Sequence, residues 1–151
     1  MHDQPHVSAQ SGYPPQYVPS FQSATDFLSC FGTSPDHALR PLFHGLDREQ
    51  FLVACLDAKH AIIGVNVVSI GSLSISIVQP REVFKPAILL NSAAIICSHN
   101  HPSGDPEPSS EDRVLTARLR QAGDLIGITI LDHIILGDDR TYSFADQGWP
   151  E

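Results

Sequence analysis

Hydrophobic and polar residues follow regular periods from about residue 49 onward. Residues 51–56 (FLVACL) and 61–68 (AIIGVNVV) are apolar runs of strand length, and the residues between them, DAKH, make a linker of hairpin size. Residues 72–78 (SLSISIV) alternate aliphatic side chains with serines, which is the period of a strand with one buried face. This pattern predicts a β-hairpin followed by a third strand.

A helix, a buried strand and a rigid loop are expected next. Pro80 suits the first turn of a helix over residues 80–91, and Pro86 should kink or shorten that helix. Residues 93–98 (AAIICS) form a continuous apolar run, which indicates a buried strand. The segment 99–108 (HNHPSGDPEP) contains three prolines and a glycine. We therefore expect it to join neither a helix nor a sheet.

A second helix should begin at Ser109 or Ser110, since either serine is a good N-cap, and should end at Gly127. Its apolar stripe is expected to consist of Leu115, Leu119, Ala122 and Ile126. Further strands are predicted at 128–131, 133–136 and 141–144, with the turn GDDR before the last. Strands interrupted by two helices indicate an α/β or α+β sheet with a helix on each side.

The N-terminal third lacks this regularity. Residues 1–23 are rich in Pro, Gln and Ser and are expected to form a disordered tail. Residues 24–48 contain short apolar groups broken by glycine and prolines, which suggests a lead-in of short helical turns. The domain itself is therefore expected to span residues 49–151.

Composition limits the class of protein. The 151 residues are 42% hydrophobic and 17% charged, as expected for one folded domain. Nine basic side chains against seventeen acidic ones give a net charge of −8, which argues against direct nucleic-acid binding. The chain has neither an apolar run of about 18 residues nor the start of a secretion signal, so we expect a soluble cytoplasmic protein without membrane contact.

The three cysteines do not suggest a disulfide framework or a cysteine-rich zinc site. Cys30, Cys55 and Cys97 are odd in number and lack CxxC spacing. We interpret them as reduced thiols. The absence of CxxC also excludes the zinc deaminases, which combine HxE with PCxxC.

Three potential metal ligands lie close together in the sequence: His99, His101 and Asp112. Side chains two apart on a strand point to the same side, so both imidazoles could reach one ion. A carboxylate at the start of the next helix could complete the set. Two imidazoles and a carboxylate are typical of a catalytic zinc site with an open fourth position.

Structural roles remain open for each of these residues. Asp112 stands three residues after Ser109, so SSED could be a capping-box variant. His99 and His101 could be polar residues at a strand end. Asp105 is expected to form a turn, and the pair Asp132-His133 could make structural hydrogen bonds, which we favour, or support the site.

The order His99-Asn-His101, seven residues, Ser109, two residues, Asp112 resembles the HxHx7SxxD motif of the JAMM (MPN-plus) metalloproteases. The segments PREVF (80–84) and LDHIILG (131–137) are similar to the bacterial RadC-like branch. The resemblance covers about residues 49–148. It implies a single JAB/MPN-like domain with a central mixed β-sheet flanked by helices, in a cytidine-deaminase-like layout.

The resemblance also implies a set of roles. His99, His101 and Asp112 would bind one Zn²⁺ per chain, and the Ser109 hydroxyl would hydrogen-bond a developing oxyanion. Glu49, at the opening of the first core strand, would be the general base for hydrolysis of an amide or isopeptide bond in a peptide or protein. Glu82, Glu107 and Glu111 are rivals for that role.

Two other functions are compatible with this family. Some MPN-type domains are catalytically silent and only bind other proteins, although the complete motif argues against this here. RadC-like proteins are also described as DNA-repair factors, and longer members carry a helix-hairpin-helix module. Residues 1–48 are expected to be too short and too weakly basic for that module. The letters HNH at 99–101 do not indicate an HNH nuclease, whose named residues lie far apart.

Overall fold

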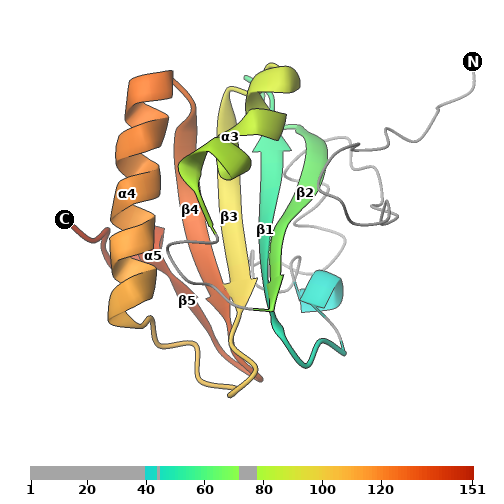
Figure 1. Cartoon of the computed structure of the whole chain (residues 1–151), viewed down its shortest axis with the longest axis vertical. Coiled ribbons are helices and arrows are strands. Elements are labelled where there is room, and N and C mark those ends of the chain that lie inside the picture. The colour runs from blue at the N-terminus through green and yellow to red at the C-terminus, as the bar shows by residue number, and fades with distance from the viewer. Residues whose placement is uncertain (1–39, 44, 72–77) are drawn as a thin grey trace, which may run out of the picture.

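The computed structural model describes residues 40–43, 45–71 and 78–151 (Figure 1). Its elements in chain order are η1 (Arg40–Phe43), β1 (Glu49–Leu56), β2 (Ile62–Gly71), α3 (Pro80–Leu89), β3 (Ala94–Asn100), α4 (Ser110–Ile126), β4 (Thr129–Leu136), β5 (Thr141–Ser143) and α5 (Phe144–Gln147). The expected tail over 1–23, most of the expected lead-in and the strand over 72–77 lie outside the described residues, as does Cys30.

The strands form one mixed sheet in the order β2-β1-β3-β4-β5. The predicted hairpin is confirmed, because β1 pairs antiparallel with β2. β1 also pairs antiparallel with β3, while β3 and β4 are parallel and β5 runs antiparallel to β4. The apolar runs of β1 and β3 thus lie inside the sheet, where both faces of a strand are covered.

Both long helices cover the same face of the sheet (Figure 1). Val83, Phe84 and Ala87 of α3 and Leu115 and Leu119 of α4 belong to one hydrophobic cluster on that face. Phe43 of η1 packs into a second cluster on the opposite face. The expectation of a helix on each side was therefore wrong, because periodicity shows which side of a helix is apolar but not which face of the sheet it covers.

The helix α4 has the expected ends and a different buried stripe. Ser109 is the N-cap, and Gly127 closes the helix in a left-handed conformation with φ of 85°. Leu115 and Leu119 are buried as predicted, but Ile126 is 44% exposed. The stripe continues through Gly123, where a Cβ atom would lie 2.6 Å from the Ile128 carbonyl oxygen and 3.3 Å from the Phe84 ring. A glycine here lets the helix approach its neighbours closely.

Several strands extend beyond the predicted apolar runs: β1 begins at Glu49 and β2 continues to Gly71. β3 continues through His99 and Asn100, which we had placed in the proline-rich loop. The apolar segments 128–131 and 133–136 belong to one strand, β4, interrupted only by a β-bulge at Leu131. Phe144, expected in the last strand, begins α5 instead.

The helix α3 is short, as its internal proline predicts. α3 contains Pro86 and ends after ten residues, at Leu89. Cys55 and Cys97 are buried free thiols, and burial raises the pKa of Cys55 to about 11. Within the described residues, no helix is both long and apolar enough to cross a membrane.

Candidate metal centre

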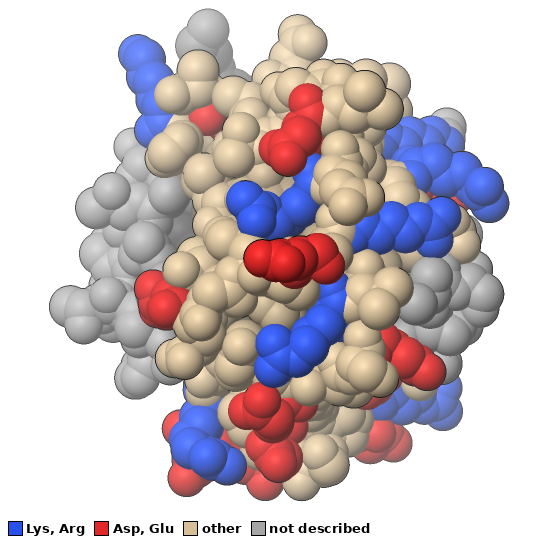
Figure 2. All heavy atoms as spheres, turned by 90° about the vertical axis from the view of Figure 1, so that its left-hand side faces the viewer, with Lys and Arg blue, Asp and Glu red and all other residues tan. Residues whose placement is uncertain are grey.

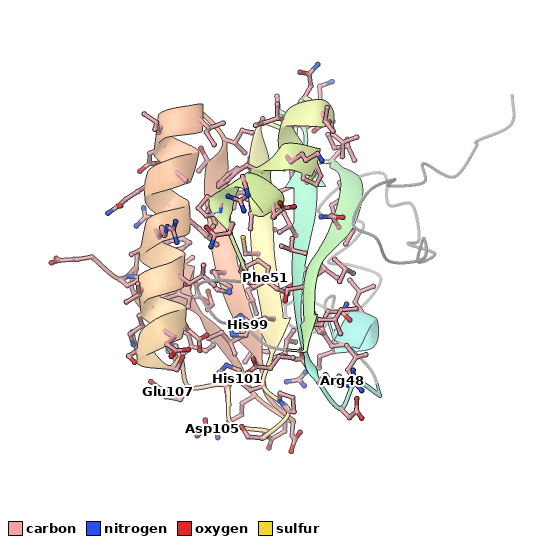
Figure 3. The ribbon with its side chains drawn as sticks, in the orientation of Figure 1. Arg48, Phe51, His99, His101, Asp105 and Glu107 are labelled. Carbon is pink, nitrogen blue, oxygen red and sulfur yellow. The ribbon has the colours of Figure 1, made fainter. Side chains whose placement is uncertain are left out.

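The side chains of His99, His101 and Asp112 come together in one place. Figure 3 shows the two histidines toward one end of the sheet. His99 is the penultimate residue of β3, His101 follows the strand, and Asp112 lies in the first turn of α4. The two Nε2 atoms are 3.1 Å apart. Asp112 Oδ1 lies 3.3 Å from His99 Nε2, and Asp112 Oδ2 lies 3.2 Å from His101 Nε2.

These distances suit a small divalent cation. Donors placed tetrahedrally at about 2.0–2.1 Å from a zinc ion are roughly 3.3–3.4 Å from one another. The 3.1 Å between the two Nε2 atoms is close to that edge length, as are the 3.3 and 3.2 Å from His99 and His101 to the two different oxygens of Asp112. The group could therefore bind a metal ion through two imidazole nitrogens and a carboxylate, with a further position open toward solvent.

Asp112 caps α4 and also faces both histidines, so the two roles that the sequence left as alternatives are compatible with each other. Ser109 Oγ accepts from the Asp112 N–H, and Asp112 Oδ2 accepts from the Ser109 N–H, so a complete capping box is present. The same carboxylate faces both histidines. Burial alone would raise the pKa of Asp112, but the adjoining imidazoles of His101 and His99 favour its carboxylate form and hold the pKa well below its usual range.

His101 has a fixed tautomer. Its Nδ1 lies 2.8 Å from the Asp105 carbonyl oxygen, which can only accept, so Nδ1 carries a hydrogen. Neutral His101 therefore presents a bare Nε2 to the site. The hydrogen bond to Asp112 raises the pKa of His101, so a proton competes with a cation for this nitrogen. Asp105 forms a turn as expected, with Oδ1 accepting from the Glu107 N–H.

Behind His99 lies a chain of buried polar groups. His99 Nδ1 is 2.8 Å from His133 Nε2, and His133 Nδ1 is 2.7 Å from Thr116 Oγ1. Thr116 Oγ1 donates over 2.7 Å to the Asp112 carbonyl oxygen. Burial lowers the pKa of both His99 and His133. Both rings are almost fully buried, which disfavours the charged imidazolium form of each.

Phe51 forms an apolar wall beside the buried polar groups behind His99. Its ring is fully buried, stacks on His99 at 6.0 Å between centroids, and meets His133 edge-on at 5.4 Å. Phe144 stacks on the same His133 at 5.3 Å. The two phenylalanines keep the histidine rings in a dry, fixed arrangement.

Glu49 lies at the rim of the site. It is the first residue of β1, is half-buried, and contributes to a hollow of about 240 Å³. Seven residues line this hollow: Glu49, His101, Pro102, Ser103, Ser109, Glu111 and Asp112. Glu82 pairs with Arg81 on α3, and the exposed Glu107 pairs with Arg113. Of the three rival glutamates, only Glu111 shares the hollow.

Asn100 anchors the strand that carries Glu49. Its side-chain Oδ1 accepts from the Gln50 N–H at 2.7 Å, and its Nδ2 donates to the Arg48 carbonyl at 2.9 Å. These two bonds bracket Glu49 just beyond the last β1–β3 pair, Phe51 with His99. The residue between the two candidate ligands thus fixes the backbone on either side of Glu49.

Ser109 retains a hydrogen-bond donor. In the capping box its Oγ acts as an acceptor, so the cap does not consume the hydroxyl hydrogen. Because Ser109 lines the same hollow as Glu49, this hydrogen could be directed at a bound molecule.

The loop that carries His101 packs against the β4–β5 turn. The Asp138 N–H donates to the Gly104 carbonyl, and the His101 N–H donates to the Leu136 carbonyl. A Cβ atom at Gly137 would lie 2.3 Å from the Gly104 carbonyl oxygen and 2.7 Å from Pro106 Cδ. Gly137 therefore permits the contact that keeps the loop in place.

Substitution of Gly137 by alanine is expected to lower the free energy of unfolding by about 1–3 kcal/mol, because backbone atoms of the loop must move. Urea denaturation of the two proteins measures the difference. Gly64→Ala is a matched control, since its added methyl would meet only the Leu90 side-chain tip at 2.8 Å. Equal stability of Gly137→Ala and the parent would show that the loop is not held by this contact.

Sequence reasoning identified the three candidate ligands, Ser109 and Glu49, and the structure brings all five together. The sequence did not predict the contacts of Thr116 and Asn100 beside the site. For the pair Asp132-His133, structural hydrogen bonds were the favoured prediction. Asp132 does have such a role, accepting from the His133 and Ala145 N–H groups and from Ser143 Oγ. His133 instead contacts His99 directly.

The side of the molecule at which α4 lies, the left-hand side of Figure 1, shows no continuous patch of either charge among the described residues. Figure 2 shows basic and acidic side chains interspersed over it. Arg113 pairs with Glu107, and Arg140 lies near both Asp105 and Asp139. The described residues on this side do not form the basic stripe expected for contact with a phosphate backbone.

Comparisons with known proteins give a consistent result. A family model described as a RadC-like JAB domain matches residues 33–149. The UPF0758 protein Mbar_A2303 of Methanosarcina barkeri is 53% identical over 102 residues, which are 68% of this chain and 44% of that protein. The UPF0758 protein TTE0897 of Caldanaerobacter subterraneus is 48% identical over 120 residues, 78% of this chain and 52% of that protein. The chain spans about half the length of these curated relatives.

Proposed function

This chain belongs to the RadC-like JAB domain family, and from this premise we propose that it is a zinc-dependent metallopeptidase that hydrolyses amide or isopeptide bonds. The observation that supports the proposal most directly is the convergence of His99, His101 and Asp112, whose possible ligand atoms all lie within 4.8 Å of one another, beside Glu49. A purely structural capping box needs neither the two bare imidazole nitrogens nor the adjoining hollow.

In this proposal His99, His101 and Asp112 would hold the zinc ion through two imidazole nitrogens and a carboxylate. When bound, zinc supplies Lewis-acid chemistry, lowering the pKa of water and polarising a carbonyl group. Glu49 accepts the proton of the attacking water and returns it to the leaving nitrogen, which completes the cleavage. The Ser109 hydroxyl donates to the oxyanion that develops on the carbonyl oxygen.

Removal of zinc is expected to abolish hydrolysis reversibly. The chain is purified without added metal, its zinc content is measured by elemental analysis, and cleavage of a mixed peptide library is followed by mass spectrometry. We expect about one zinc per chain, loss of cleavage after treatment with a chelator, and recovery when zinc is returned. The His101→Ala and Asp112→Asn variants should contain no zinc.

The alternative functions predict other outcomes. A chain that binds zinc but cleaves no peptide, alone or with cell-extract proteins as substrates, would favour a binding module. A zinc content below about 0.1 per chain, with no zinc taken up on titration, would contradict the metallopeptidase proposal. A DNA-repair accessory that contacts DNA directly would show salt-sensitive DNA affinity.

A further inference from the structure

The polar chain behind His99 has a direction that can be deduced from its first link. The Asp112 carbonyl oxygen carries no hydrogen, and it lies 2.7 Å from Thr116 Oγ1. Two oxygens at this distance need a hydrogen between them, so the threonine hydroxyl donates to the carbonyl. Its single hydrogen is then used, and Thr116 Oγ1 can only accept from His133 Nδ1 at 2.7 Å.

The remaining links follow in sequence. A neutral His133 with a hydrogen on Nδ1 has a bare Nε2, which accepts from His99 Nδ1 at 2.8 Å. A neutral His99 with a hydrogen on Nδ1 has a bare Nε2, which faces the bare His101 Nε2 at 3.1 Å and Asp112 Oδ1 at 3.3 Å. Three acceptors with no hydrogen between them thus converge where a cation could bind. The direction of every hydrogen bond therefore originates at one backbone carbonyl of α4.

We propose that Thr116 and His133 are positioning residues that set the tautomer of His99, leaving its Nε2 lone pair available to the metal ion. This inference rests on the proposed function in so far as the ion is zinc. It adds two residues outside the ligand set and gives each a defined task. Substitution of a residue that orients a metal ligand through hydrogen bonds typically weakens metal affinity by about 10–100-fold.

The opposite tautomer provides the physical contrast. If the Thr116 hydroxyl pointed at His133 Nδ1, then His133 would donate from Nε2 and His99 would carry its hydrogen on Nε2. That hydrogen would project into the space between His101 and Asp112 and would have to leave before a cation could bind. It would also leave two oxygen lone pairs facing each other over the 2.7 Å between Thr116 and Asp112.

The fold keeps His133 in place for this task. The β-bulge at Leu131 inserts one unpaired residue into β4, so that Ile95 pairs with Ile130 but Cys97 pairs with His133. Partners on adjacent parallel strands share a face, and His133 is thereby turned to the face of Cys97 and His99. Phe51 and Phe144 then pack on its ring, which is 1% exposed, and oppose a ring flip.

The proposal is tested with two variants at Thr116. Thr116→Val has the same shape but no hydroxyl, whereas Thr116→Ser keeps the hydroxyl. Zinc affinity is measured by competition with a chromophoric chelator. We expect about 10–100-fold weaker binding for Thr116→Val and binding near that of the parent for Thr116→Ser. Equal affinity of the parent and Thr116→Val would overturn the proposal.

A second measurement reads the tautomer without metal. Long-range ¹H–¹⁵N spectra of the zinc-free parent distinguish a protonated ring nitrogen from a bare one. We expect the His99 and His133 signals to report hydrogen on Nδ1 and none on Nε2, and the pattern of His99 to change in Thr116→Val. A hydrogen on His99 Nε2 in the parent would overturn the inference. Failure of the parent to bind zinc would instead count against the proposed function.

Discussion

Glu49→Gln is expected to lower kcat by about 10²–10⁴-fold while zinc content stays at about one per chain. Glutamine keeps the size and hydrogen-bonding reach of the side chain but cannot accept a proton. Because Glu49 lies at the rim of the hollow and outside the group of three candidate ligands, its loss should leave metal binding intact. Zinc content and the rate of peptide cleavage, measured on the same preparation, separate the two properties.

The matched control is Glu111→Gln, which changes the only other glutamate lining the hollow. Its carboxylate is exposed in the first turn of α4, so we expect a small change in kcat. The reverse result, with Glu111→Gln inactive and Glu49→Gln active, would transfer the role of general base to Glu111. Loss of zinc from Glu49→Gln would place Glu49 among the ligands instead.

Phe51→Ala is expected to lower the free energy of unfolding by about 3–5 kcal/mol. The side chain is fully buried in the cluster between the sheet and the helices, so truncation removes apolar contacts and leaves a cavity. The cavity would adjoin His99 and His133, and both rings would lose a packing partner. We therefore expect weaker zinc binding as well, which chelator competition would measure.

Urea denaturation gives the stability difference, and Leu125→Ala is the control. Leu125 is 89% exposed, so its truncation should change stability by no more than about 0.5 kcal/mol. A cost below about 1 kcal/mol for Phe51→Ala would mean that the surrounding side chains collapse into the space. In that case the phenylalanine would not be the wall that fixes the histidine rings.

The candidate ligands could be predicted from sequence because each depends on local spacing. His99 and His101 are two apart at the end of an apolar run, and Asp112 follows a serine cap by three residues. Strand alternation and capping geometry are short-range rules. The ends of elements were harder, since β3 continues to Asn100 by pairing with β1 and β4, which are distant in the sequence.

The face of the sheet on which His133 lies could not be predicted from its local sequence. Counting in steps of two from Ile130 would place it on the face opposite to its observed one. The bulge at Leu131 reverses the alternation, and nothing in the local sequence marks that residue as unpaired. Thr116 and Asn100 were missed for a related reason, because their partners lie 17 and about 50 positions away.

The separation of the site along the chain has a consequence for how it assembles. The three candidate ligands lie within residues 99–112, so joining them closes a short loop at low entropic cost. Glu49 joins them only when β1 pairs with β3, and this contact between segments about 50 positions apart closes a longer loop at a higher entropic cost. A partly folded chain could thus capture zinc before the proton acceptor is in place. Such binding to non-native states reduces the stabilisation that zinc gives the native fold, so the rise in melting temperature on adding zinc should understate the affinity of the finished site.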